Sequence, residues 1–298
     1  MDGSNRQDSA HETMLIVEGG ALRSVFSLGL LDCFLKDNFN PFDSYIGVSA
    51  GASNLAVFLS GTPRINIKAY LDLVLSGKFI NYWRFLRGGH LIDLDWLLAE
   101  IYSQSLLDIP AIFSHDRSFY VAITNVASGE AEYVMANPKN LLSVIKASTA
   151  LPLFYRGFTE VDGRPMTDGG VADGIPIQQA IRLGAKRIMV VLSRSDTYQK
   201  TDTWVHRYIR WRMRNHPLLV ATMKERVEQH KAVIKLIHNP PPGVSIVAVC
   251  PPAHFAVDRF TRDRDSLLQG YQIGFDTAEA AIARWRTLQS PSNTTSDM

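Results

Sequence analysis

The sequence predicts a three-layer α/β/α domain with a mostly parallel central sheet, followed by a mainly helical C-terminal extension. Short apolar runs alternate with longer segments of helical pattern, which is typical of parallel strands joined by crossover helices. After about residue 195 the chain becomes basic, aromatic and largely helical in pattern. We therefore expect a main domain over residues 14–195 and an extension over 196–289. The polar ends, 1–13 and 290–298, are expected to be disordered.

The first elements follow from apolar runs and the turns that end them. Residues 14–17 are apolar and stop at two glycines, which predicts a buried strand. Residues 22–37 are apolar on most sides and suit a helix packed into the core. Residues 42–46 predict a second strand and residues 50–59 a second helix, which completes one strand–helix–strand step.

The middle of the chain is expected to be helical and then to return to strands. Residues 62–110 look helical and contain aromatic and apolar stretches at 79–86 and 96–98. These stretches are interpreted as the lining or cap of an acyl-chain channel, or else as core helices. In the rest of the main domain we expect strands at 119–124 and 131–135 joined by a hairpin-like turn at 127–130, then a helix at 141–148 and a strand at 187–192. In the extension we expect a helical segment over 202–238 ended by prolines, a strand at 244–249 and a helix near 266–287.

Composition favours a soluble protein in a reducing compartment. Apolar residues make up 46% of the 298, and the net charge of +2 gives no overall attraction to nucleic acid. Cys33 and Cys250 lie in apolar runs and indicate buried free thiols, not a disulfide framework or a zinc site. No secretory signal is evident, and no stretch approaches the roughly 20 apolar residues of a spanning helix. We therefore expect a cytoplasmic location.

The candidate nucleophile is Ser49, in the sequence Gly47-Val-Ser-Ala-Gly51. This G-x-S-x-G pattern lies between a predicted strand and a predicted helix, where a sharp turn exposes the serine hydroxyl and the flanking Gly47 and Gly51 make room for it. The pattern alone also fits a helix N-cap or a tight packing turn. Its place between strand and helix favours a nucleophile elbow.

A glycine-containing loop precedes this serine by one strand–helix–strand step. Gly19, Gly20 and Ala21 open the first predicted helix, where free N–H groups are expected to face an anion. Such donors stabilise the oxyanion of acyl transfer. Arg23 would add charge or hold the loop in place. A dinucleotide-binding loop is disfavoured, because Ala21 and Ser24 occupy the later glycine positions of G-x-G-x-x-G.

The residues leave two candidates for the base that a serine nucleophile needs. Asp168 is followed by Gly169 and Gly170, and burial would raise the proton affinity of its carboxylate. Considered alone, this segment also fits an ordinary Asx-turn. His254 is the alternative, as part of a Ser–Asp–His triad in an α/β-hydrolase, although that fold normally places its elbow deeper in the sheet.

In order and spacing these segments resemble the patatin-like phospholipases. That family combines a glycine-rich oxyanion loop, a G-x-S-x-G elbow and an Asp-Gly-Gly or Asp-Gly-Ala motif that supplies the base of a Ser–Asp dyad. The resemblance implies that Ser49 is the nucleophile and Asp168 the base. It also implies an oxyanion loop with its arginine, made by Gly19, Gly20, Ala21 and Arg23.

The resemblance covers residues 14–192 and includes segments 147–152 and 173–176. Residues 200–287 look like the extra C-terminal region of a bacterial branch of the family. The resemblance implies a lipid acyl hydrolase of the phospholipase A or lysophospholipase type, without a metal or organic cofactor. The sequence departs from the family pattern at Ala21 and Ser24, where the family has glycine. A non-catalytic lipid-binding protein with the same fold is the other alternative.

Residues 206–216 form a basic and aromatic segment that predicts contact with an anionic membrane. Arginines and histidines alternate there with Tyr208, Trp211 and Met213, a composition that suits lipid headgroups. We therefore expect peripheral association with the inner face of the membrane. The alternatives are a solvated helix face or a clamp on the acidic stretch 258–265. Nucleic acid is not an expected partner, since no matching motif is present, and the sequence does not determine the oligomeric state.

Overall fold

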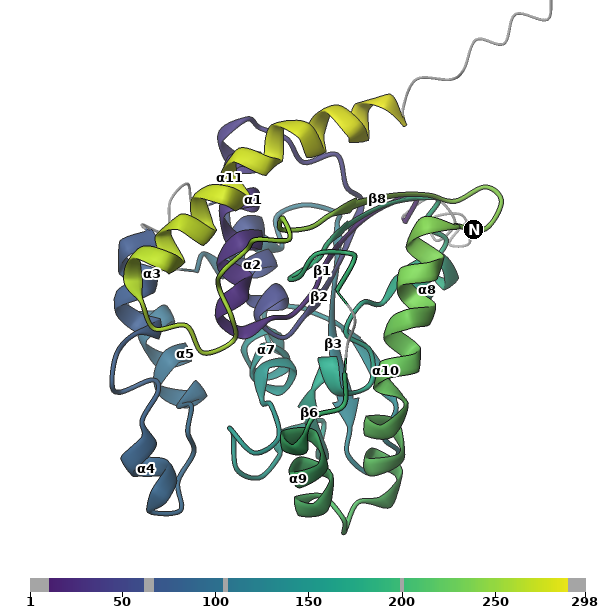
Figure 1. The fold of residues 1–298 in the computed structure, drawn as a ribbon. Helices are drawn as coiled ribbons and strands as arrows, with labels where there is room; N and C mark the ends of the chain where they lie inside the picture. The colour runs from purple at the N-terminus through teal and green to yellow at the C-terminus, as the bar shows by residue number, and fades with distance from the viewer. Residues whose placement is uncertain (1–10, 62–66, 104–106, 199–200, 289–298) are drawn as a thin grey trace, which may run out of the picture.

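The computed structural model describes residues 11–61, 67–103, 107–198 and 201–288 (Figure 1). Most of the two ends that were expected to be disordered, 1–13 and 290–298, lies outside these ranges. Of the described N-terminal residues, Thr13 already begins the first strand.

An eight-stranded sheet forms the centre of the molecule. Its parallel part runs in the order β3-β2-β1-β7-β8, which consists of β3 (Ser118–Asn125), β2 (Ser44–Val48), β1 (Thr13–Val17), β7 (Arg187–Val191) and β8 (Ser245–Val249). Every residue of β1 and β2 is buried, as expected for central parallel strands covered on both faces. The predicted mostly parallel sheet is therefore confirmed.

Antiparallel strands complete the sheet beside β3. Strand β4 (Ala131–Met135) pairs with residues 120–124 of β3, and β6 (Arg164–Asp168) pairs with residues 123–125. Strand β5 (Thr159–Val161) forms a hairpin with β6. The sequence did not predict β5 and β6, because both are short and their apolar residues are too few to show an alternating pattern.

Helices cover both faces of the sheet, so the predicted three-layer arrangement is confirmed. One layer contains α1 (Val25–Lys36), α2 (Ala50–Leu59), α7 (Leu141–Thr149) and α11 (Arg264–Thr287), and the other contains α8 (Ile177–Arg182) and α10 (Pro217–His238). Strand β1 shows the division: Leu15 and Val17 belong to the core cluster of the first layer, and Met14 and Ile16 to that of the second.

The C-terminal part of the chain contributes to this core. Helix α11 packs against α1 through one glycine from each helix. A Cβ on Gly274 of α11 would lie 1.9 Å from the carbonyl oxygen of Phe26, and one on Gly29 of α1 would lie 2.0 Å from that of Tyr271. Further along α11, the fully buried Trp285 packs against Phe42 with 4.9 Å between ring centroids. The expected boundary at residue 195 falls in the connection between β7 and the next helix.

The helical segments expected from the sequence are present, with one difference. Between α2 and β3 lie α3 (Ile67–Val74), α4 (Tyr82–Leu86), α5 (Leu94–Ser103) and α6 (Ile109–Ile112). The expected segment over 202–238 is two helices, α9 (Trp204–Arg212) and α10, because Pro217 cannot continue a helix from the preceding turn and instead begins a new one. Within the described ranges, no helix combines the length and apolar character that crossing a bilayer requires.

Candidate active site

Ser49 occupies the turn between β2 and α2 in a strained backbone conformation. Its φ of 53° and ψ of −130° belong to a region that residues other than glycine rarely adopt. The flanking glycines permit the turn: a Cβ on Gly47 would lie 2.4 Å from the Cα of Ala52, and one on Gly51 would lie 2.3 Å from the carbonyl oxygen of Val17. The arrangement has the strand–turn–helix context of a nucleophile elbow.

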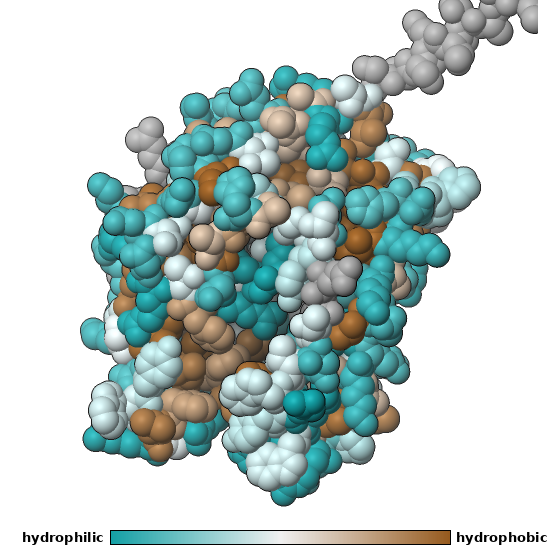
Figure 2. Space-filling model, in the orientation of Figure 1, coloured by the Kyte–Doolittle hydropathy of each residue, from teal (hydrophilic) through white to brown (hydrophobic). Residues whose placement is uncertain are grey.

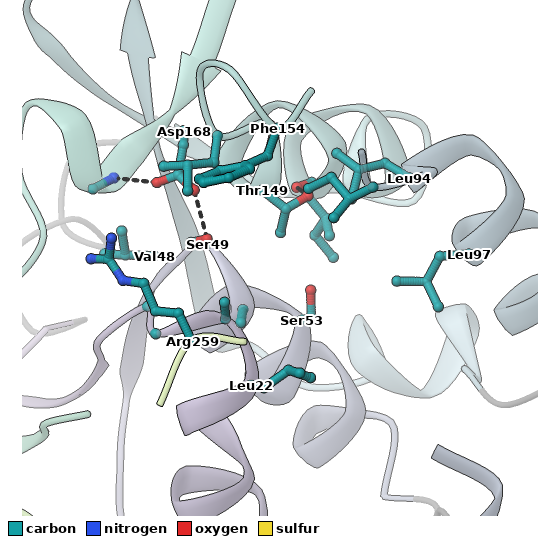
Figure 3. A pocket seen from close by; sticks show the side chains of 18 of the residues that line it. Leu22, Val48, Ser49, Ser53, Leu94, Leu97, Thr149, Phe154, Asp168 and Arg259 are labelled. Carbon is teal, nitrogen blue, oxygen red and sulfur yellow. Dashed lines mark hydrogen bonds between the residues drawn. The ribbon is translucent and has the colours of Figure 1, made fainter. Parts of the chain in front are cut away.

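The hydroxyl of Ser49 donates a hydrogen bond of 2.7 Å to Oδ2 of Asp168 (Figure 3). The other carboxylate oxygen, Oδ1, accepts a 2.7 Å hydrogen bond from the backbone N–H of Gly170. Asp168 is only 4% exposed. Gly169 fits against β3 for lack of a side chain, since a Cβ there would lie 2.1 Å from the carbonyl oxygen of Ala122. One oxygen of Asp168 is thus held by the backbone while the other faces the serine.

Strand β3 brings these two residues together. Because β4 occupies one edge of β3 along residues 120–124, β2 and β6 must share the other edge. On that edge the last residue of β2, Val48, pairs with Ala122, and Asp168 pairs with the next residue, Ile123. The ends of β2 and β6 therefore meet at consecutive positions of one strand.

Ser148, on α7, reinforces this junction. Its hydroxyl accepts a 2.7 Å hydrogen bond from the N–H of Ser49 and donates one of 2.6 Å to the carbonyl oxygen of Ala122. It lies in segment 147–152, which is part of the resemblance to the patatin-like phospholipases, and it is fully buried. The contact ties the candidate nucleophile directly to β3.

Burial raises the pKa of Asp168 to about 6. Hydrogen bonds from Ser49 and Gly170, and the positive charges of Arg259 and Arg226, act in the opposite direction and partly offset the effect of burial. A carboxylate with this pKa is still ionised at neutral pH and is a better proton acceptor than an ordinary aspartate.

Backbone donors surround the serine. No described residue accepts a hydrogen bond from the N–H groups of Gly19, Gly20 or Ala21, and the N–H of Ala50, at the start of α2, is likewise unpaired among the described residues. A Cβ on Gly19 would lie 2.6 Å from Cβ of Ser49, so this loop is adjacent to the elbow. Ala50 was not among the predicted site residues, although the residue after an elbow serine commonly supplies such a donor.

The departures from the family's glycine pattern are accommodated in the loop. Ala21 has a φ of 51°, the left-handed region in which glycine is preferred, so its methyl group adds backbone strain. Ser24 is buried at the end of a short 3-10 helix, Ala21–Ser24, that precedes α1. The loop therefore keeps its backbone N–H groups free of acceptors among the described residues, even though alanine and serine replace its later glycines.

Arg23 attaches the loop to the residue that follows β7. The side chain is 3% exposed and donates a 3.1 Å hydrogen bond to Oγ of Ser193, just beyond β7. Glu18 accepts a 2.6 Å hydrogen bond from the N–H of the same serine. Of the two roles predicted for Arg23, these contacts favour attachment of the loop.

A cavity of about 300 Å³ opens beside Ser49 and Asp168. Figure 3 shows Leu94 and Leu97 on the side of the cavity away from Asp168. Its apolar lining comes largely from the α3–α5 region and α7, and includes Tyr70, Val74, Phe79, Ile80, Leu94, Leu97, Leu98, Ile101, Leu142 and Ile145. Residues from both apolar stretches singled out in the sequence, 79–86 and 96–98, therefore line the cavity.

The C-terminal region supplies the basic part of the lining. The cavity is lined by His206, Arg210, Arg226 and Arg259, of which Arg226 and Arg259 were not among the predicted site residues. No local motif marks them, because Arg226 lies in the middle of α10 and Arg259 in the loop before α11. His254, in the same loop, is exposed and is not among the described residues that line the cavity.

A sequence model of the patatin-like phospholipases matches residues 15–181, more than half of the chain. The protein is a member of the patatin-like phospholipase family. The matched range includes the elbow, the loop and the Asp-Gly-Gly motif of this patatin-like protein, and the predicted resemblance is confirmed. A second model, described as a domain of unknown function (DUF6363), matches residues 216–289, so the C-terminal region has a family of its own.

Two individual proteins that this patatin-like protein resembles do not indicate which reaction it catalyses. The uncharacterized protein YjjU of Escherichia coli K12 is 35% identical over 265 residues, which cover 87% of this chain and 74% of that protein. The crystal structure of VipD from Legionella pneumophila superposes with a TM-score of 0.44 and 12% identity, over 92% of this chain and 67% of VipD. The predicted bacterial branch therefore stays a prediction.

Proposed function

We propose that this patatin-like protein is a serine lipid acyl hydrolase of the phospholipase A or lysophospholipase type. Ser49 is the nucleophile and Asp168 is the base. The observation that carries the proposal is the 2.7 Å hydrogen bond from Ser49 Oγ to the buried carboxylate of Asp168, at the edge of an apolar cavity. Family membership supports a lipid hydrolase in general.

The proposed reaction proceeds in two halves. Asp168 accepts the proton of Ser49 while Oγ attacks the ester carbonyl carbon, and the N–H groups of the 19–21 loop and Ala50 stabilise the resulting oxyanion. The protonated Asp168 then donates its proton to the departing alcohol, which leaves an acyl group on Ser49. Water, deprotonated by Asp168, then attacks the acyl carbonyl carbon. The bond between this carbon and Oγ breaks, the fatty acid leaves, and Asp168 returns the proton to Oγ of Ser49.

The cavity supports an ester of a long apolar acid as the substrate. Its lining beyond the serine is mostly aliphatic and aromatic, with the polar Ser53, Asn54 and Thr149 among the lining residues. An acyl chain placed there would gain about 0.8 kcal/mol for each CH₂ group removed from water. The carbonyl end of such a chain would lie next to Ser49, where the cavity becomes polar.

Membrane contact through residues 206–216 is the second part of the proposal. Arg207, Arg212 and Arg214 are exposed there, and Trp204 and Trp211 on α9 are 72% and 56% exposed. One alternative for this segment was an ion pair with the acidic stretch 258–265. Arg210 instead binds both carboxylate oxygens of Asp202, which precedes α9, at 2.8 and 2.7 Å.

Helix α4 presents a second apolar surface at the same end of the molecule as α9 (Figure 1). Tyr82, Trp83 and Leu86 are 52%, 72% and 74% exposed. Figure 2 shows a hollow with hydrophobic walls between these two helical ends. Exposed aromatic and basic groups on both sides of a cavity mouth suit extraction of a lipid from an anionic bilayer.

The decisive experiment compares wild type with Ser49→Ala. We expect a fluorophosphonate probe to label the wild-type serine and not the variant, and hydrolysis of lipid and short-chain esters to depend on the same serine. A folded wild-type protein that neither reacts with the probe nor hydrolyses any ester in the panel would favour the non-catalytic lipid-binding alternative.

A further inference from the structure

Two arginines from the C-terminal region lie at the polar end of the cavity. Arg226 extends from α10 and Arg259 from the loop that connects β8 with α11, and both line the cavity together with Ser49 and Asp168. Figure 3 shows the guanidinium of Arg259 on the side of Val48 and Ser49, whereas Leu94 and Leu97 lie on the other side. The cavity thus has a cationic end and an apolar end.

Neither arginine is bound to an acid within the described residues. Nε of Arg226 is buried without a hydrogen-bond partner, and Arg259 forms no hydrogen bond or ion pair with any described residue. Two acids act on Arg226 through their charge, and both have other partners: Asp202 is bound by Arg210, and Asp168 accepts hydrogen bonds from Ser49 and Gly170. Glu18 accepts a hydrogen bond from the N–H of Ser193. Two guanidinium groups are therefore available beside the serine.

The two cations lie close enough to repel each other and to act on the dyad. Burial, followed by the charge of Arg259, lowers the pKa of Arg226 to about 10. Both arginines also lower the pKa of Asp168. The ionised Asp168 offsets only part of this positive charge, so a ligand that places a further anion between the two arginines would gain on binding.

We propose that Arg226 and Arg259 form a subsite for the phosphate of a phospholipid or lysophospholipid headgroup, and that this subsite selects phosphate-bearing esters over neutral glycerides. The inference rests on the proposed function and specifies its substrate. Guanidinium groups bind phosphate oxygens through paired, charge-assisted hydrogen bonds. With the phosphate at this end and the acyl chain at the apolar end, the ester carbonyl between them would lie near Ser49.

The first test is a substrate ratio. The kcat/KM for 1-dodecanoylglycerol 3-phosphate is divided by that for 1-dodecanoylglycerol, with both substrates below their micelle concentrations. Loss of one charged hydrogen-bond donor should lower this ratio by about 10- to 100-fold in Arg226→Gln or Arg259→Gln. Any effect of these substitutions on the pKa of Asp168 acts on both substrates and cancels. Arg259→Lys should restore part of the ratio, and Arg286→Gln, an exposed position near the end of α11, is the matched control.

The second test measures binding without catalysis. The ether analogues 1-O-dodecylglycerol 3-phosphate and 1-O-dodecylglycerol have no carbonyl to cleave, so titration calorimetry on the full chain measures only their affinity. We expect the phosphate analogue to bind at least about 10-fold more tightly, and this preference to disappear in Arg226→Gln/Arg259→Gln. Inorganic phosphate is titrated in parallel. An equal, arginine-dependent affinity for it would assign the subsite to free phosphate and overturn the headgroup inference.

The two tests separate this inference from the proposed function. If no ester is hydrolysed but the arginines still select the ether phosphate, the enzyme proposal fails and the phosphate subsite stands. If hydrolysis depends on Ser49 but neither the ratio nor the binding preference depends on the arginines, the subsite inference is wrong. Thermal unfolding of each variant confirms that the folded protein is being compared.

Discussion

The hydroxyl of Ser49 and the carboxylate of Asp168 are 119 positions apart in the chain and 2.7 Å apart in space. They meet where the pairing of β3 with β2 ends and its pairing with β6 begins, along one edge of β3. The contact is direct, without an intervening imidazole. It links a strained turn to a buried acid.

Removal of either member of the pair should abolish turnover. We expect Ser49→Ala and Asp168→Ala each to lower kcat by at least about 1,000-fold, because the nucleophile or its proton acceptor is lost. His254→Ala should leave most of the activity, since this histidine is exposed outside the described cavity lining. Steady-state hydrolysis of one ester by all three variants is the measurement. Loss of activity in His254→Ala with retention in Asp168→Ala would instead support a triad.

The pH dependence of kcat/KM should report the ionisation of Asp168. Only its carboxylate accepts a proton, so activity should increase as the pH rises through about 6 and level off above it. Arg259→Gln should shift this acidic limb to higher pH, because the charge of Arg259 lowers the pKa of Asp168. The rate of a neutral ester is measured from pH 4.5 to 8.5, with folding monitored at each pH. A limb that stays in place in the variant would contradict the assigned electrostatics.

Asp168→Asn should stabilise the fold while removing activity. A folded pKa of about 6 against the ordinary 3.8 means that the ionised form is disfavoured by about 3 kcal/mol in the native state. This group's contribution to stability is present below pH 3.8 and is lost as the pH rises through 6. Urea unfolding should therefore show a gain of up to about 3 kcal/mol for Asp168→Asn above pH 6, which fades towards pH 4. A pH-independent difference would show that Asp168 titrates normally.

Gly19→Ala should impair catalysis with little loss of the substrate-binding cavity. The added methyl group would lie 2.6 Å from Cβ of Ser49, so the loop must move. Its N–H groups would then no longer point at the oxyanion. We expect kcat to fall by about 100-fold or more, as for the loss of an oxyanion donor. Gly77→Ala is the control, because a Cβ there meets nothing within 4 Å. Similar activity of the two variants would exclude the 19–21 loop from the reaction.

The exposed aromatic groups of α4 and α9 should contribute to vesicle binding. We expect Trp83→Ala and Trp211→Ala each to weaken co-sedimentation with vesicles that contain phosphatidylglycerol, and added salt to weaken it further by screening the arginines. Met135→Ala removes an exposed apolar residue of β4, outside both helices, and serves as the control. Binding that is insensitive to salt and to both tryptophans would remove this surface from the proposal.

Much of the fold was predictable because it is encoded locally. The apolar runs at 14–17 and 187–192 mark buried parallel strands regardless of their neighbours, the run at 244–249 marks a partly buried one, and the helices between them follow from pattern. The β5–β6 hairpin was missed because three- and five-residue strands with mixed polarity carry too little pattern. The break at Pro217 was missed because the helical pattern continues across it.

The elbow and the glycine loop could be predicted from the sequence alone, since each is a contiguous motif whose residue types are required by backbone geometry, and together with the Asp-Gly-Gly motif they indicated the family. The contact of Ser49 with Asp168, and not with His254, follows from the three-dimensional fold, because strand register on β3 sets that distance. The fold also decided that Arg226 and Arg259 reach the same cavity as the serine. They come from separate elements of the C-terminal region, and packing against the sheet, which no local pattern records, brings them together.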